Sequence, residues 1–360
     1  MWHVSFTARG NVALIQDSVF AYIQGLFQRG VVLIVGSGAS CAYGLPSMRE
    51  LAEHLLEVVP GDLADDEDAR REWERIATGL AAGEGLESAL GERPLPESLA
   101  DLLTAAITYR VQLSEGAAIA EILGAEQVSP FGRLLEHVLR SATQADVITT
   151  NYDRLIEVHA ARAGVRVDSM YYGHTVGRLD SGLSRDELFE AHVAAGRRMR
   201  GVSVRMRPHI RLAKPHGSLD WFAHDGQYYR SDLAIPGSRQ IIAPGGNKYR
   251  LGYEVPFDQQ RNRANTAIDE AASLLTVGYG FNDEHLQTHL RSKFAQVPAV
   301  VVSHSLTSNA LNYLGSNSGA IGIEAIADGQ GSRIVQAGEY LELDTPIWDL
   351  EHLVKEVLGI

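Results

Sequence analysis

The sequence predicts an α/β fold, namely a doubly wound, mainly parallel sheet of the Rossmann-like type with a helical insertion. Short runs of apolar, mostly β-branched residues recur along the chain, and each ends in glycine or small polar residues. Between these runs, apolar residues return every three or four positions, which is typical of amphipathic helices. Buried strands that alternate with helices form parallel sheets covered on both faces. The 360 residues, of which 45% are hydrophobic, are enough to bury a large core.

The first strand, turn and helix lie near the start of the chain. Residues 31–35, VVLIV, predict a fully buried parallel strand. This strand ends in a glycine-rich turn, GSGAS, at residues 36–40. Ser47 and Glu50 then have the spacing of a capping box, so we expect a helix to begin near Ser47.

The rest of the chain continues the alternation around one long helical stretch. Residues 61–142 have helical spacing almost throughout and predict a helical insertion. Residues 340–360 are expected to close the chain with a C-terminal helix. We treat residues 1–360 as a single domain that includes the insertion and this helix.

Composition and charge exclude several classes of protein. The net charge of −13 argues against direct nucleic-acid binding, because such a protein has to neutralise phosphates. No segment is apolar for long enough to span a membrane, and the first residues lack the pattern of a signal peptide, so we expect a cytoplasmic protein. The single cysteine, Cys41, excludes a cysteine-based zinc site, and we expect no bound metal.

Glycine and polar residues gather at the carboxyl ends of four predicted strands. These ends are GSGAS at residues 36–40, TTNYD at 149–153, KPHGS at 214–218 and GYGFND at 278–283. A further strand, AVVVSHS at residues 299–305, ends beside them. In an open α/β sheet the ligand binds outside the carboxyl ends of the strands, so these residues predict a ligand site.

The glycine turn itself suggests a bound diphosphate. Gly36 and Gly38 let the backbone approach a ligand closely, and their N–H groups can point at phosphate oxygens. The positive end of the helix expected from Ser47 would favour the same anion. A purely structural tight turn is the alternative, because Cys41 replaces the third glycine of the usual dinucleotide fingerprint.

Two other strand ends carry side chains suited to catalysis. Asn151 can position a ribose or a water molecule, although it can equally serve as the N-cap of the helix that follows. His216 can accept a proton, although it can equally be a buried turn histidine with a satisfied ring. Both are therefore candidates for a shared active site.

Taken together and in this order, the four motifs resemble the sirtuin family. The counterparts are GSGASCAYGLPSMR at residues 36–49, NYD at 151–153, the pair His216-Gly217, and VGYG at 277–280. The closer similarity is to the bacterial sirtuin-like branch, whose members read TTNYD, HGS and GYSxxD and often hydrolyse NAD in anti-phage defence. The chain departs from deacetylating sirtuins, because it lacks the four-cysteine zinc ribbon and the Asp and Phe of the G-I-P-D-F-R segment.

The resemblance implies an enzyme, an NAD+ glycohydrolase (NADase) that uses NAD as its substrate. It implies that Asn151 orients the nicotinamide ribose or the attacking water, that His216 is the general base, and that Asp153 steadies charge or holds its loop. Asp283, Gly278 and Gly280 would then line the adenosine side. The implied NAD contacts are Gly36, Ser37, Gly38, Ala39, Ser40, Thr150, Gly278, Gly280, Asp283 and Ser303.

The resemblance also implies partners and leaves alternatives open. Members of this branch with a single domain often act in abortive infection, assemble as homo-oligomers and pair with a HerA-type translocase ATPase. The alternatives to hydrolysis are a sensor that binds NAD or ADP-ribose, an assembly subunit of such an ATPase complex, and a protein ADP-ribosyltransferase. The product would be ADP-ribose or its cyclised form.

Overall fold

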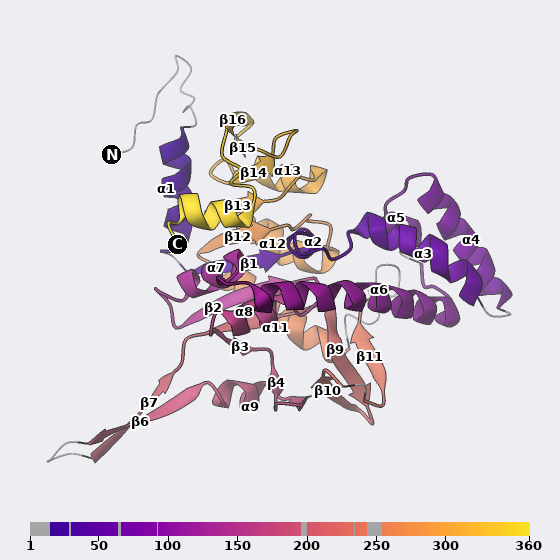
Figure 1. The fold of residues 1–360 in the computed structure, drawn as a ribbon, viewed down its shortest axis with the longest axis horizontal. Coiled ribbons are helices and arrows are strands. Elements are labelled where there is room, and N and C mark those ends of the chain that lie inside the picture. The colour runs from indigo at the N-terminus through magenta and orange to yellow at the C-terminus, as the bar shows by residue number, and fades with distance from the viewer. Residues whose placement is uncertain are drawn as a thin grey trace.

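A nine-stranded sheet forms the centre of the computed structural model, which describes residues 15–28, 30–63, 66–91, 93–195, 200–233, 235–242 and 254–360. The strand order is β16-β15-β14-β13-β12-β1-β2-β8-β3 (Figure 1). All neighbours pair in parallel except β14 with β15 and β15 with β16. The strands are β1 Val31–Val35, β2 Gln144–Thr149, β3 Arg166–Asp168, β8 His209–Ala213, β12 Ser273–Val277, β13 Ala299–Val302, β14 Ile321–Ala325, β15 Ser332–Gln336 and β16 Glu339–Leu343. The predicted doubly wound, mainly parallel α/β fold is confirmed.

Strand β1 lies at the point where the strand order reverses. It pairs with β12 on one side and with β2 on the other, and all five of its residues are buried. Leu33 and Val35 face a core with α1 (Gln16–Leu26), α7 (Pro130–Val138) and α8 (Leu155–Arg162). Val32 and Ile34 face the opposite core with α11 (Phe257–Glu270), α12 (Glu284–Phe294) and α13 (Ser308–Gly315). The carboxyl end of β1 is therefore the switch point at which open α/β sheets bind ligands.

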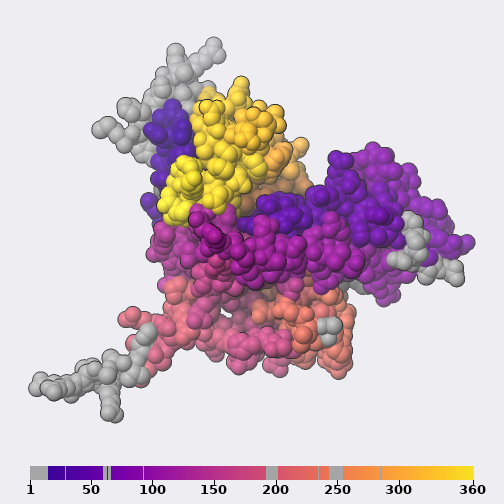
Figure 2. Space-filling model, in the orientation of Figure 1, coloured from indigo at the N-terminus to yellow at the C-terminus, as the bar shows by residue number. Residues whose placement is uncertain are grey.

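A group of helices between β1 and β2 projects from one side of the sheet (Figures 1 and 2). It contains α3 (Met48–Asp62), α4 (Glu67–Ala81), α5 (Leu86–Leu90) and α6 (Glu97–Gly124), which share a core of their own. Tyr152 and Leu155, just after β2, belong to this same core. Buried Glu115 of α6 also pairs with Arg154, whose Nη2 lies 2.5 Å from Glu115 Oε2. The helices are therefore fixed to the loop that follows β2.

One strand of a smaller antiparallel sheet, β9, begins directly after His216. The strand order of this sheet is β11-β9-β10-β5-β4, with β4 at Tyr171–Tyr172, β5 at Val176–Leu179, β9 at Gly217–His224, β10 at Gln227–Ser231 and β11 at Ser238–Ile241. Helix α9 (Ser181–Asp186) and the hairpin of β6 (Phe189–Ala195) and β7 (Arg200–Met206) lie to the left of it in Figure 1. The hydrogen bond from Ile242 N to His216 O, at 2.9 Å, ties the loop of His216 to the end of β11.

The end of the chain differs from the expected helix over 340–360. Residues Glu339–Leu343 form strand β16, because the sequence EYLEL alternates between more and less buried side chains. Helical turns occupy only α14 (Leu350–His352) and the π-helical η1 (Leu353–Val357). Among the described helices, none combines the length and apolar character needed to cross a membrane.

Candidate functional site

A cavity at the carboxyl ends of β1, β2, β8 and β12 brings together most of the predicted site residues. Those that line it are Gly36, Ser37, Ser40, Thr150, Asn151, Asp153, His216, Gly280 and Asp283. Helices α3, α5 and α6 close one side of this polar cavity through Met48, Glu87 and Val111. The sequence analysis did not identify these three residues, because nothing in the sequence of the helical stretch shows which of its faces meets the strand ends.

A second cavity lies on the other side of the glycine turn and holds the remaining predicted residues. Gly38, Ala39, Gly278 and Ser303 line it, and Ser40 lines both cavities. Its other walls are rich in rings, namely Tyr43, Phe131, His159, His304 and Trp348. We call the first cavity the polar cavity and the second the aromatic cavity. The predicted residues thus divide into two groups that share one turn.

The glycines of the turn are needed for the contact between two strand ends. A Cβ atom on Gly36 would lie 2.4 Å from Gly278 O, and one on Gly278 would lie 2.3 Å from Ala39 N. Gly36 N and Gly38 N donate hydrogen bonds to Val277 O and Gly278 O, each at 3.0 Å. These two N–H groups, expected to reach a phosphate, therefore bind the neighbouring loop, which supports the structural alternative for them.

The helix expected to begin near Ser47 is present, but an unexpected short helix separates it from the turn. A short helix, α2 (Ser37–Cys41), comes first, and α3 begins at Met48. The predicted capping box is present, since Ser47 Oγ accepts from Glu50 N while the Glu50 carboxylate accepts from Ser47 N at 2.7 Å. A carboxylate therefore already lies at this helix end, and the expectation that the end favours a bound diphosphate stays a prediction.

Asn151 holds the turn in place and does not act as a helix cap. Its Nδ2 donates to Gly36 O at 3.0 Å and to Ser40 Oγ at 2.8 Å. Ser40 Oγ in turn donates to Asp153 Oδ2 at 2.7 Å, and Asp153 Oδ1 accepts from Leu155 N at 3.1 Å. The N-cap of α8 is Arg154, whose side chain makes no capping hydrogen bond, and Asp153, the residue before it, accepts from the first N–H of the helix. Among the described residues, Asn151 Oδ1 accepts no hydrogen bond.

The Asp153 carboxyl group is buried, and its surroundings act on its charge in opposite directions. Burial raises the pKa of Asp153, while the charge of Lys214 and the hydrogen bond from Ser40 lower it. Its two oxygens are both engaged with the protein, so its contacts fit the loop-holding role better than charge stabilisation.

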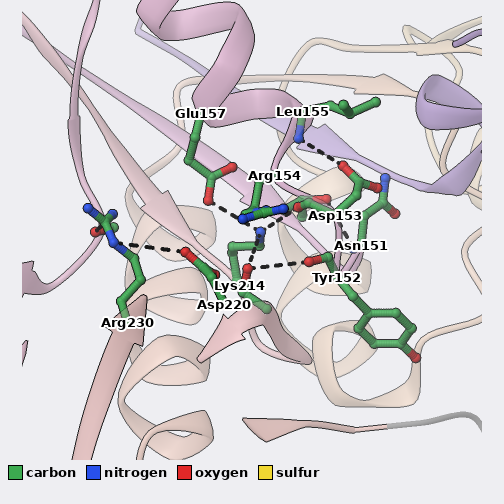
Figure 3. Close-up of polar contacts among 12 residues, drawn as sticks. Asn151, Tyr152, Asp153, Arg154, Leu155, Glu157, Lys214, Asp220 and Arg230 are labelled. Atoms are coloured by element: carbon green, nitrogen blue, oxygen red, sulfur yellow. Dashed lines mark hydrogen bonds and ion pairs between the residues drawn. The ribbon is translucent and has the colours of Figure 1, made fainter. Parts of the chain in front are cut away.

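Lys214 lies at the centre of a buried polar cluster beneath the site (Figure 3). Its side chain is 1% exposed, and Nζ donates to Asp153 O at 2.5 Å and to Ser218 Oγ at 2.9 Å. Glu157 Oε1 lies 3.3 Å from the same Nζ. Lys214 was not predicted as part of the site, although its place at the end of an expected strand, directly after Leu212 and Ala213, was a signal that it needed buried partners.

His216 faces an acidic side chain from another strand end. Its Nε2 lies 3.1 Å from Asp283 Oδ2, and both side chains are 7% exposed. Gly217 permits this loop, because its φ is +81° and a Cβ atom there would lie 2.1 Å from Gln240 O. Asp283 was expected on the adenosine side of the ligand, but it lies in the polar cavity beside His216.

Two tyrosines of the cavity, and Cys41 beside the turn, favour their neutral forms. Burial raises the pKa of Tyr152 and Tyr279 well above the usual range, and the charges of Glu87 and Asp283 act in the same direction. Burial also raises the pKa of Cys41 near the turn, which makes it a poor nucleophile. Among the side chains that the structure describes, no group of three His, Cys, Asp or Glu is arranged to hold a metal ion.

Comparison with known proteins identifies one domain. Residues 145–308 match the family model of the SIR2-like domain, a region that contains Asn151, His216 and Asp283 but not the glycine turn. No curated protein matches the chain. Over these residues the chain is therefore similar to the SIR2-like domain.

Several solved structures share the general arrangement at low similarity. One, described as the "Structural Basis for the Mechanism and Regulation of Sir2 Enzymes", has 12% identity and a TM-score of 0.43 over 95% of this chain and 100% of that chain. A Sir2 homologue mutant in complex with 2'-O-acetyl ADP ribose has 13% identity and a TM-score of 0.45, over 96% and 99%. A serine mutant of a Sir2 homologue with ADP ribose has 13% identity and a TM-score of 0.44, again over 96% and 99%.

Proposed function

We propose that this chain is an NAD+ glycohydrolase, which cleaves the bond between nicotinamide and ribose and uses water as the acceptor. The observation that carries the proposal is the pair of cavities that share Ser40: one has Asn151, His216 and Asp283 in its wall, and the other is lined by aromatic rings. A dinucleotide has two such ends joined by a diphosphate. Its nicotinamide ribose fits the polar cavity with Asn151 and His216, and its adenosine fits the aromatic cavity beside Ser303.

The polar cavity has the groups that glycosidic cleavage needs. The bond to nicotinamide breaks with its electron pair on the leaving nitrogen, through an oxocarbenium-like state. Asn151 Oδ1 orients the ribose or the attacking water. His216 accepts a proton from that water or from a ribose hydroxyl, a role that typically contributes about 10²–10⁴-fold to a rate. Asp153 keeps the turn and the loop of Asn151 together through Ser40.

Water is the acceptor that best suits this cavity. Helices α3, α5 and α6 cover one side of it with Met48, Glu87 and Val111. A peptide acceptor would need an open groove at the same point, whereas water needs only a small polar space. Hydrolysis to nicotinamide and ADP-ribose therefore ranks above transfer to a protein.

The motif resemblance supports a wider role for this activity. We propose that the chain acts in the cytoplasm in bacterial anti-phage defence, where loss of NAD stops the infected cell. On the motif resemblance alone, we further propose a homo-oligomer that works with a HerA-type ATPase. Residues 1–360 would form one functional domain, with 61–142 as its helical insertion.

Product analysis tests the proposal directly. The purified chain is incubated with NAD in water enriched in ¹⁸O. The products are separated, and their masses are measured by mass spectrometry. Equal amounts of nicotinamide and ¹⁸O-labelled ADP-ribose support hydrolysis. ADP-ribose attached to protein would instead indicate a transferase, and bound but intact NAD would indicate a sensor. Either of these results would replace the proposal.

A further inference from the structure

The contact between His216 and Asp283 joins two strand ends that are far apart in the sequence. His216 follows β8, whereas Asp283 follows β12, and β1 and β2 lie between these strands in the sheet. Nε2 and Oδ2 approach to 3.1 Å although both side chains are almost fully buried. A carboxylate held this close to an imidazole in a buried place acts strongly on its charge and orientation.

Other charged and titratable groups surround the polar cavity on every side. Asp153 follows β2, Lys214 precedes His216 on its own loop, and Glu87 comes from α5. The phenol groups of Tyr152 and Tyr279 complete the set. Asp153 is bonded to Ser40 and Leu155 N, and Lys214 to the Asp153 carbonyl group and Ser218. Asp283 is the carboxylate whose contact with the imidazole the structure gives.

We propose that Asp283 is a positioning residue that orients His216 and stabilises its protonated form during the reaction. Asp283 Oδ2 lies at ion-pair distance from Nε2, 3.1 Å, and its charge favours a proton on that nitrogen, so we assign the lone pair of the neutral imidazole to Nδ1. This rests on the proposed function, because it gives the base of that reaction its partner. It replaces the adenosine contact that the sequence analysis assigned to Asp283.

In the proposed reaction, bond formation, bond cleavage and proton transfer take place in one step. The oxygen of water forms a bond to the ribose carbon as the bond to nicotinamide breaks. One proton of that water passes to Nδ1, which gives an imidazolium ion hydrogen-bonded to Asp283. The carboxylate stays ionised and its charge offsets the new positive charge, which is the arrangement of His–Asp pairs in other hydrolases.

The test measures the titration of His216 and the reaction separately. Histidine-labelled protein is titrated by NMR for the wild type, Asp283→Asn and Glu87→Gln, and the His216 signal is assigned by its loss in His216→Gln. Glu87→Gln is the matched control, since it removes one negative charge from the same cavity and leaves Asp283 in place. The pH dependence of nicotinamide release is recorded for the same proteins.

We expect the titration midpoint of His216 to fall by at least one pH unit in Asp283→Asn, a tenfold weaker affinity for the proton, and by less than half of that in Glu87→Gln. The acidic limb of kcat/KM should move to lower pH by the same amount. An unchanged midpoint, or equal shifts in both variants, would overturn the proposal. The NMR result stands even when the wild type releases no nicotinamide, a result that would count against the proposed function alone.

Discussion

The ammonium group of Lys214 donates a hydrogen bond to the backbone carbonyl of Asp153, at 2.5 Å from Nζ to O. This bond ties the loop that carries His216 to the loop that carries Asn151. Leu219 N reinforces the connection by donating to Tyr152 O at 3.0 Å. The relative position of the two candidate catalytic residues therefore depends on a lysine that contacts neither of them.

Replacing Lys214 by methionine should destabilise the protein severely. The change keeps the length of the side chain but leaves the Asp153 carbonyl group and the Glu157 carboxylate without their buried cation. Breaking such a buried pair costs about 3–5 kcal/mol of unfolding free energy, measured by urea denaturation. The control is Lys355→Met, because the Lys355 side chain is 67% exposed and its loss should change stability by less than about 0.5 kcal/mol. Equal effects of the two changes would show that the buried cluster has no special importance.

A substitution at Gly278 should separate the two strand ends. Its φ is +59°, and an alanine Cβ atom would lie 2.3 Å from Ala39 N, so the glycine turn has to move. Gly338→Ala is the matched control, because its φ of +82° imposes a similar backbone cost while nothing lies within 4 Å of the added atom. We expect Gly338→Ala to cost about 1–2 kcal/mol and Gly278→Ala clearly more, in thermal or urea unfolding. A smaller loss for Gly278→Ala would contradict the close packing of the two turns.

His159 should make the protein less stable in mild acid. It is 3% exposed, packs against the rings of Tyr43 and Phe131, and its Nδ1 lies 2.7 Å from Ser129 Oγ. Burial lowers the pKa of His159 from 6.5 to about 4. Because the folded pKa is depressed, this residue's contribution is present above about pH 6.5 and is lost as the pH falls towards 4. The full effect is roughly 3 kcal/mol.

The pH dependence is checked by urea denaturation at pH 7.5 and 4.5. Wild-type protein should lose about 2–3 kcal/mol more than His159→Gln over this interval, since the amide does not titrate. His174→Gln removes an exposed histidine and should follow the wild type. Parallel curves for the wild type and His159→Gln would show that His159 is protonated without penalty in the fold.

The strands of the sheet could be predicted because buried parallel strands are continuous apolar runs. VVLIV became β1, and the runs that end at Thr149, Val277 and Val302 became β2, β12 and β13. The prediction of a helix over residues 340–360 was wrong for the first part of that segment. The sequence EYLEL alternates with a period of two, and it directly precedes apolar residues at helical spacing, so the two patterns were read as one helix. The spacing of apolar residues therefore predicted a strand or helix correctly where the same spacing continued along the whole segment.

The sequence predicted which strand ends form the site, but not which side chains contact each other there. Their position at one edge of a parallel sheet follows from the fold, so Asn151 and His216 were expected to converge. Which side chains meet across that edge depends on tertiary packing, as with Asp283 and His216 or Lys214 and Asp153. The sequence also did not predict that α2 divides the ligand site into two cavities. This division arises where Gly36 and Gly278 bring two backbones together.

The rate of nicotinamide release from NAD tests the central claim most directly. It is measured for the wild type, Asn151→Ala and His216→Ala, with folding of each protein verified by its unfolding curve. We predict that the wild type releases nicotinamide and that each variant is slower by at least about 10²-fold while remaining folded. Wild-type release that both folded variants retain would contradict the assignment of these residues. An absence of both release and NAD binding in the wild type would contradict the NAD site itself.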